Sequence, residues 1–467
     1  MLQVYDRALS KNFFAEPSPE GHWSKNFAAL SIHRRKDWAV TVKGFNRFVW
    51  DFEGTQKENA HGIFQSHGAM LIANSEESLK AHNVSEGWDW TKIPGATTMN
   101  LTLQETLLNE ARHFSPQSHA GGVTFKGPEP FSDGAFGMDL HQPDYQFLNR
   151  NPHPNIKLSF KKSVFFYQNL LVCLGSNITV QNGGDRVAQT TLFQDRLQNA
   201  SSAPAQVERK DKTGKIDYIS IVDTKGNSYF IPRSSVSSLK FLSANQTSQT
   251  PSTKPSVGYY ATAWLEHRSP NGYYEYAVYV NTPSYPQPAD VFWEYHNRYP
   301  YEKPYKVLKQ DHEAHVVKFE VTPARWTWLE PFYSYVIFMS KPTLPVGPIT
   351  EVTNQSRIMI DEDDMYVYLS ISYPDLNFPV SNELKALRDI GDTEMFYMES
   401  KEVEVNVTLT TNVNKVVQTV VHGLPDGHGY VPEVRVEPLS SHGSPKRNKI
   451  VFANLKNGFS VEIKLSK

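Results

Sequence analysis

The chain has 467 residues, a formal charge of −2, 39% hydrophobic and 12% aromatic residues, and a single cysteine. This length exceeds one ordinary core, so we expect two or three domains, and the apolar content excludes a disordered chain. The near-neutral charge gives no nucleic-acid signature, and no apolar run is long enough to span a bilayer. The lone Cys173 excludes an intramolecular disulfide and a thiolate metal cluster, and its apolar neighbours predict a buried, inert thiol.

Helix is expected in only three short segments. These are residues 2–14, 104–113 and 383–389. In the first, Val4, Ala8 and Leu9 share a helical face and Pro17 ends it. We therefore expect residues 1–20 to be the end of a preceding helical region. Residues 1–10 lack a cationic stretch followed by an apolar one, so no signal peptide is visible.

The rest of the chain is predicted to be β. Alternating segments rich in Val, Ile, Tyr and Phe occur at 39–43, 161–174, 274–280, 316–321, 365–372, 403–410 and 459–465. Turn signals separate them at 182–185, 225–227 and 270–272. This pattern predicts an all-β fold in which large antiparallel sheets pack face to face.

Two stretches indicate loops or boundaries. Residues 234–256 are dense in Ser, Thr, Asn and Pro, and we expect a loop there. Residues 341–349 are rich in Pro and Gly, so we place a domain break near 350. The prediction is a large multi-sheet sandwich at 21–345 and a smaller carboxy-terminal β-sandwich at 350–467.

A basic cluster lies early in the chain, at His33, Arg34 and Arg35. From Lys25 to Lys57 there are seven Lys or Arg residues against three Asp or Glu. A local positive field suits an anionic ligand such as a sulfated or uronic-acid polymer. A solvated strand edge that repels other edges explains the same charges.

Glu53, Glu58 and Asn59 form a polar group that follows this cluster. A carboxylate there can hold a guanidinium or take part in proton transfer, and paired carboxylates also occur in glycosidases. A polar turn between strands is the alternative reading. Further on, Trp88 and Trp90 flank Asp89, so an extended segment would put both rings on one face. The pair is either a platform for sugar stacking or a buried contact between sheets.

No strong metal motif is present. His312 and His315 are three residues apart and give a weak candidate pair, and the acidic run at 361–364 lacks the alternating spacing of an EF-hand. We expect no metal or other cofactor, and the need for a divalent cation stays open.

At this point a family resemblance is visible. The chain resembles the carboxy-terminal half of a polysaccharide lyase of family 8, the family of chondroitin and hyaluronate lyases. The matching segments are 32–34, 49–53, 58–62, 65–68, 87–98, 174–178, 190–194, 263–267, 274–276 and 374–377. The resemblance is greatest to the chondroitin ABC lyases, and it rests on the order and spacing of these segments together.

The resemblance implies β-elimination at a uronic acid of a glycosaminoglycan such as chondroitin sulfate, dermatan sulfate or hyaluronan. In the family, a Tyr, a His and an Arg lie on an α/α toroid that precedes the β half, and a Glu of the β half reaches the same cleft. Glu53 matches that Glu. The toroid residues have no counterpart here, and Ala60-His61 replaces the basic and aromatic pair that often follows the Asn.

The resemblance therefore implies Glu53 as the catalytic candidate. The candidate substrate-binding residues are His33, Arg34, Arg35, Glu58, Asn59, His67, Trp88 and Trp90. The expected partners are an acidic polysaccharide and a helical toroid domain or chain, with no nucleic acid and no membrane. The implied location is extracellular or periplasmic. The alternative function is a non-catalytic module that binds acidic polysaccharide.

Overall fold

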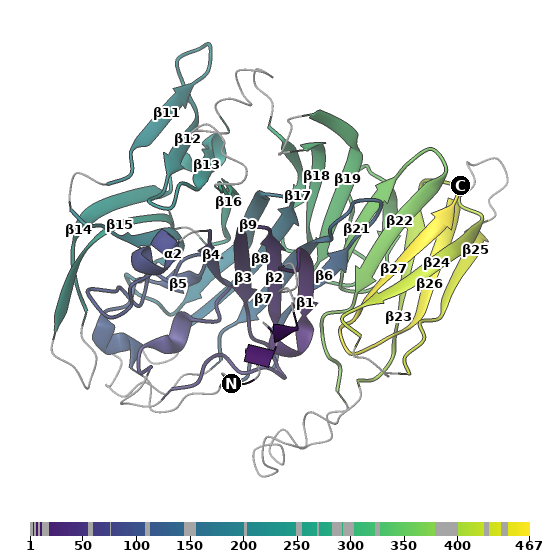
Figure 1. Ribbon diagram of the computed structural model, residues 1–467, viewed down its shortest axis with the longest axis horizontal. Coiled ribbons are helices and arrows are strands. Elements are labelled where there is room, and N and C mark those ends of the chain that lie inside the picture. The colour runs from purple at the N-terminus through teal and green to yellow at the C-terminus, as the bar shows by residue number, and fades with distance from the viewer. Residues whose placement is uncertain are drawn as a thin grey trace, which may run out of the picture.

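The computed structural model describes most of the chain. The described residues are 3, 6, 7, 10, 11, 18–54, 59–74, 76–107, 113–143, 156–199, 203–248, 255–268, 270–282, 292, 303–322, 327–378, 400–424, 429–439 and 447–467. Their regular structure is mainly antiparallel β-strand in five sheets (Figure 1). The expected all-β class is confirmed. No helix in this part of the chain has the length and apolar character needed to cross a membrane.

Two of the four-stranded sheets are the N-terminal sheet and the lateral sheet. The N-terminal sheet contains, in spatial order, β1 (Gly21–Lys25), β2 (Leu30–Arg35), β3 (Trp38–Lys43) and β4 (Ala69–Ala73). The lateral sheet contains, in spatial order, β14 (Leu239–Ser248), β15 (Ser256–His267), β10 (Ala188–Arg196) and β5 (Thr97–Met99). Every second residue of β3 is buried, so the alternation at 39–43 predicted both a strand and its inward face.

An eight-stranded sheet forms the centre of the molecule. It contains, in spatial order, β11 (Gln206–Lys210), β12 (Ile216–Val222), β13 (Ser228–Pro232), β16 (Gly272–Tyr279), β9 (Leu170–Gln181), β8 (Lys157–Tyr167), β7 (Asp133–His141) and β6 (His119–Phe125). The segment 161–174, expected as one strand, is the hairpin of β8 and β9, which turns at Gln168 with a φ of 49°. Next to the turn both strands are buried on both faces, so the apolar run continues through the turn and conceals it.

Two further sheets complete the molecule. The seven-stranded sheet contains, in spatial order, β17 (Tyr305–Gln310), β18 (Ala314–Thr322), β19 (Thr327–Ile337), β21 (Ser356–Glu362), β22 (Tyr366–Ser372), β27 (Ser460–Ser466) and β24 (Lys415–His422). The outer sheet contains, in spatial order, β20 (Ile349–Val352), β23 (Val403–Leu409), β26 (Arg447–Leu455) and β25 (Val434–Leu439).

The sheets stack in layers around three large apolar cores. The N-terminal and lateral sheets pack on one face of the central sheet, as the shared core of Val40, Phe136 and Ala263 shows. The seven-stranded sheet covers the opposite face through Phe165 and Phe332. The outer sheet then packs on the far side of the seven-stranded sheet. This layered arrangement is a super-sandwich, with β14 and β15 of the lateral sheet at one end, the carboxy-terminal sheets at the other and the N-terminal strands between them (Figure 1).

The seven-stranded sheet runs across the boundary expected near residue 350. Its strand β19 pairs with β21, with Tyr333 opposite Ile360. Fully buried Arg357 on β21 also donates hydrogen bonds to the carbonyl oxygens of Ile337 at 2.7 Å and Gly137 at 3.1 Å. Backbone pairing and this guanidinium therefore join the segments on both sides of residue 350.

The loop expected at 234–256 is wrong for much of its length. Residues 239–248 form β14, which pairs along its whole length with β15. Because β14 is an edge strand with many exposed side chains, its composition is polar and resembles that of a loop. The helices whose bounds lie within the described residues are short. These are α2 (Glu76–Ala81), α3 (Arg233–Val236), η1 (Asn26–Ala28), η2 (Gly62–Phe64) and η3 (Leu103–Thr106).

The expected helix at 104–113 is reduced to the 3-10 turn η3 in its described part. The helix at 383–389 and most of 2–14 lie outside the described residues.

Candidate functional site

The connection between β3 and β4 carries the candidate catalytic residue. Buried Asn46 accepts hydrogen bonds from the backbone of Phe48 at 2.8 Å and of Val49 at 2.9 Å. Buried Asp51 accepts one from the backbone N–H of His113 at 2.8 Å and lies 3.1 Å from its ring Nδ1. These contacts fix the chain just before Glu53, whose side chain is exposed.

A pair of side-chain amides holds the other end of the Glu53 segment. Asn59 Nδ2 donates to the carbonyl oxygen of Glu53 at 2.7 Å and to Gln65 Oε1 at 3.0 Å. Gln65 Nε2 donates back to Asn59 Oδ1 at 3.1 Å. Asn59 has a φ of 52°, a left-handed conformation that Asn tolerates. A Cβ on Gly62 would lie 2.7 Å from both amide atoms of Asn59, so this packing requires glycine.

Glu53 and Asn59 are thus brought together, whereas Glu58 lies outside the described residues. Sequence reasoning gave Gln65 no role. The only available signal was its place in the segment 65–68 that resembles the family.

His67, a predicted substrate-binding residue, is fully buried. Its ring lies 5.5 Å from the ring of Phe45 and 5.1 Å from that of Phe64. Burial lowers the pKa of His67 to about 4, so the imidazole is neutral at pH 7. This position corrects the prediction, because a ring enclosed by aromatic neighbours packs the connection and does not reach a polymer.

The basic cluster on β2 is divided by the two faces of the strand. His33 is fully buried, its Nε2 lies 2.8 Å from the carbonyl oxygen of Gln168, and burial holds its pKa well below the usual range. Arg35 is also buried and forms an ion pair with Asp133. Arg34, between them, points to the other face and is half-buried. The structure therefore contradicts direct polymer contact by His33 and Arg35, since both side chains face the interior.

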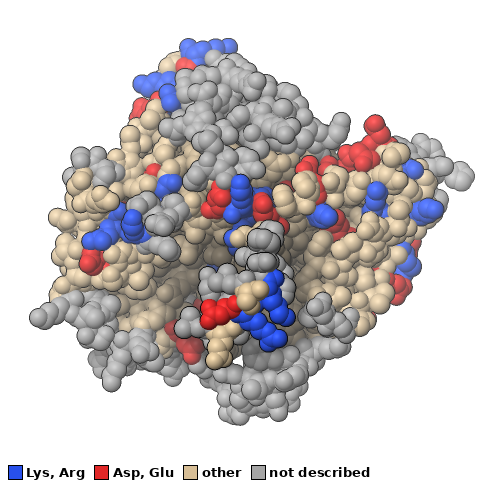
Figure 2. Space-filling model, in the orientation of Figure 1, with Lys and Arg blue, Asp and Glu red and all other residues tan. Residues whose placement is uncertain are grey.

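Other cations of this region are also engaged. Arg47 pairs with Asp375, and Lys43 Nζ donates to the carbonyl oxygens of Ala28 at 2.9 Å and Gly44 at 2.6 Å. Figure 2 shows that blue and red side chains lie close together at several places on the visible face. The local excess of positive charge in the sequence is thus partly neutralised by the fold.

The segment with the two tryptophans is clamped to β10. Gln194 accepts a hydrogen bond from the backbone N–H of Asp89 at 3.0 Å and donates to the carbonyl oxygen of Lys92 at 3.0 Å. Trp88 is 1% exposed and packs against the rings of His82, at 4.6 Å, and Tyr260, at 6.1 Å. Trp88 is therefore a buried packing residue, in agreement with the reading of a buried contact, and its ring has no exposed face on which a sugar could stack, contrary to its place among the candidate substrate-binding residues. Trp90 is partly exposed.

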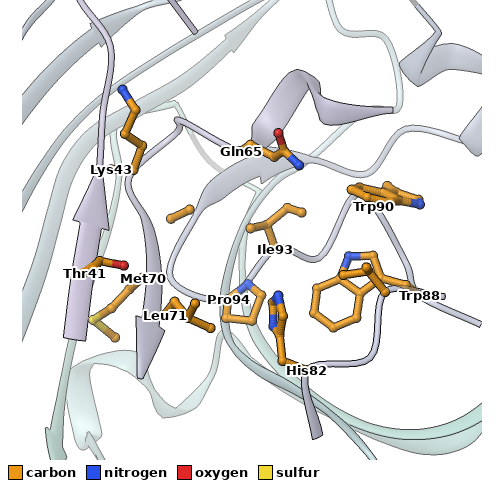
Figure 3. A pocket seen from close by; sticks show the side chains of 12 residues that line it. Thr41, Lys43, Gln65, Met70, Leu71, His82, Trp88, Trp90, Ile93 and Pro94 are labelled. Carbon is orange, nitrogen blue, oxygen red and sulfur yellow. The ribbon is translucent and has the colours of Figure 1, made fainter. Parts of the chain in front are cut away.

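Both tryptophans line a depression beside β3 and β4, with a volume of about 210 Å³ (Figure 3). Trp88 and Trp90 lie on one side of it, and Thr41 and the side chain of Lys43 lie on the other. Gln65 also lines it, so the amide pair that holds Glu53 borders this depression.

The candidate metal ligands do not come together. His315 is fully buried between the hydroxyl groups of Ser163, 2.7 Å from its Nδ1, and Ser176, 2.8 Å from its Nε2, while His312 is exposed. No group of three His, Cys, Asp or Glu side chains in the described residues has the geometry to hold a metal ion. Cys173 is buried, and burial raises the pKa of its thiol to about 11.

The layered sheets and this connection have a counterpart among known proteins. Residues 23–289 match the super-sandwich domain of polysaccharide lyase family 8. The chain belongs to polysaccharide lyase family 8.

Two curated relatives illustrate the similarity. The chain is 27% identical over 446 residues to a chondroitin sulfate ABC exolyase of Bacteroides thetaiotaomicron. This match covers 89% of this chain and 40% of the relative. It is 28% identical over 376 residues to a chondroitin sulfate ABC endolyase of Proteus vulgaris, covering 73% of this chain and 34% of the relative. The chain thus spans less than half the length of the relatives it matches.

Solved structures share the fold. A Streptomyces coelicolor A3 chondroitin AC lyase in complex with chondroitin sulphate superposes with a TM-score of 0.66 and 17% identity, over 97% of this chain and 50% of that one. A Paenibacillus xanthan lyase gives a TM-score of 0.69 and 14% identity, over 100% of this chain and 39% of that one.

Proposed function

We propose that this chain is the β portion of a glycosaminoglycan lyase that acts by β-elimination at a uronic acid, and that a helical body completes its cleft. The observation that carries the proposal is the exposed Glu53 carboxylate on a segment fixed at both ends, by Asp51 before it and by Asn59 after it. Membership of a polysaccharide lyase family supports the reaction class. The names of the relatives support chondroitin sulfate as substrate.

The chemical problem in this reaction is the weak acidity of the proton on C5 of the uronic acid. That proton leaves only when the adjacent carboxylate is neutralised by hydrogen bonds or positive charge and a base stands close to it. A fixed carboxylate such as Glu53 would orient a basic side chain on the facing helical body and favour its protonated, charged form. Arg34, the half-buried cation of β2, would attract the anionic polymer.

Incubation of the purified chain with chondroitin sulfate and with hyaluronan, alone and with a separately supplied helical half, tests this function. We expect ultraviolet absorption from the unsaturated product only when both parts are present. Binding of intact polymer without product from the combined parts would instead favour the alternative function, a non-catalytic polysaccharide-binding module. The extracellular or periplasmic location is proposed on the same basis, because such polymers are found outside cells.

A further inference from the structure

A second depression is also lined by the tryptophan pair. Its volume is about 370 Å³, and Trp88 and Trp90 line it as they line the first depression. The remaining lining residues are Asp89, Thr91, Lys92, Asn100, Leu101, Leu103, Gln246 and Thr247. The partly exposed indole of Trp90 is therefore a wall shared by two adjacent depressions.

Three polar atoms around this wall have no partner within the described residues. They are the indole nitrogens of Trp88 and Trp90 and the Oε1 of Gln246. Trp88 is 1% exposed, and a buried indole N–H or amide oxygen normally has a hydrogen-bond partner. The residues that line the second depression therefore include two indole N–H donors and one amide acceptor for which the described residues supply no partner, which favours a ligand with both donor and acceptor groups.

The other lining groups narrow the class of ligand. The exposed Asn100 and Thr247 offer an amide and a hydroxyl group. Lys92 lies 3.7 Å from Asp89 Oδ2, and its Nζ is 4.6 Å from the centre of the Trp264 ring, so one cation is held at a defined place on the wall. A pyranose presents an apolar C–H face to an indole and hydroxyl groups at its edge, and a carboxylate or sulfate on it would pair with Lys92.

We propose that the two depressions lined by Trp90 form a subsite on the β body that binds pyranose units of an acidic polysaccharide without help from the helical body. The choice of polymer rests on the proposed function. Of the lining residues, Gln65 is hydrogen bonded to Asn59, which in turn holds the carbonyl oxygen of Glu53. The subsite thus adjoins the candidate catalytic segment but does not include Glu53.

Calorimetry of the purified chain alone with defined oligosaccharides of chondroitin sulfate and of hyaluronan tests the subsite. We expect binding by the unmodified chain and a loss of about tenfold in affinity for Trp90→Ala, equal to about 1.4 kcal/mol. Trp90→Phe, which keeps a ring, should recover most of the affinity. Tyr273→Ala removes an aromatic residue that is 52% exposed and lies outside both depressions, and it should bind like the unmodified chain.

Unchanged affinity in folded Trp90→Ala, or no binding by the unmodified chain, would overturn the subsite. If Trp90→Ala fails to fold, as judged by its melting curve, the exposed Asn100→Ala decides the question, and unchanged affinity then overturns the proposal. Failure of the lyase assay is a separate result: binding that depends on Trp90 with no product from the combined parts rejects the proposed function and leaves the subsite intact.

Discussion

The side-chain amides of Asn59 and Gln65 are hydrogen bonded to each other in both directions, at 3.0 and 3.1 Å. Asn59 also holds the carbonyl oxygen of Glu53 at 2.7 Å, while Gln65 lines the depression that contains Trp90. Two amides therefore connect the backbone of Glu53 to the proposed sugar subsite. The geometry of the Glu53 segment depends on this pair, because no strand covers the described residues 44–54 and 59–68.

Gln65→Ala should loosen this segment. It removes both bonds of the amide pair and leaves the left-handed backbone of Asn59 unchanged, so we expect a loss of about 1 kcal/mol in the free energy of unfolding. Chemical denaturation measures this loss. Gln206→Ala, at an exposed position of edge strand β11, is the matched control. Equal stability of the two variants would contradict a structural role for the pair.

Glu53→Gln should abolish lyase activity when the chain is combined with a helical half. The neutral amide keeps the shape of the side chain but lacks the negative charge that favours the protonated form of a facing basic group. We therefore expect turnover to fall by at least about 100-fold. Product absorption gives the rate. Glu208→Gln, at an exposed position on β11, should retain full turnover. Full turnover of Glu53→Gln would refute the assigned role.

Arg34→Ala should lower the affinity for polymer without a large change in stability. Arg34 is the cation of the cluster that faces away from the interior, and its attraction to an anionic chain is screened by salt. Titration calorimetry with chondroitin sulfate at low and high salt measures the effect. An isotherm identical to that of the unmodified chain would remove Arg34 from the site.

Arg35→Met should instead destabilise the fold. It leaves the Asp133 carboxylate buried without its guanidinium partner, and breaking one side of a buried ion pair costs about 3–5 kcal/mol. Thermal unfolding should show a clear fall in melting temperature. The double variant Arg35→Met/Asp133→Leu should recover part of the loss. If Arg35→Met melted like the unmodified chain, the pair would not support the packing of β2 on the central sheet.

The chain should lose stability as the pH falls from about 6.5 toward 4. Folding lowers the pKa of His67 from 6.5 to about 4, so between these two pH values the unfolded chain binds a proton at His67 and the folded chain does not. The stabilisation is complete above pH 6.5 and is lost at about 1.4 kcal/mol per pH unit as the pH falls through this window. Buried His22, His267 and His315, each with a pKa lowered to about 3, add to the same trend.

Unfolding free energies at several pH values check this for His67→Phe, which keeps an aromatic ring between Phe45 and Phe64. The slope of its unfolding free energy against pH, between pH 6 and 4.5, should be smaller by about 1.4 kcal/mol per pH unit, which corresponds to about one proton. An unchanged slope would show that His67 is not the titrating group.

Much of the fold followed from local pattern. Alternation at 39–43 and 403–410 specified strands with one covered face, and these are β3 and β23. The pattern failed where composition and pairing disagree. The polar edge strand β14 resembled a loop, and the doubly covered hairpin β8–β9 resembled one long strand. In both cases the missing information was what lies beside or on top of the strand.

For the candidate site, the sequence by itself determined which residue types lie in order: a carboxylate after a Val-Trp pair, an Asn with a Gly three positions on, and a Trp-Asp-Trp segment. Only the tertiary structure decided which of them face outward. His33, Arg34 and Arg35 are neighbours in sequence, yet the central sheet covers His33 and Arg35 and leaves Arg34 partly free. Likewise Trp88 is buried by His82 and Tyr260 while Trp90 is not. The physical reason is that the exposure of a side chain depends on the packing of segments that are distant in the sequence. The spacing of residues along the chain does not determine that packing.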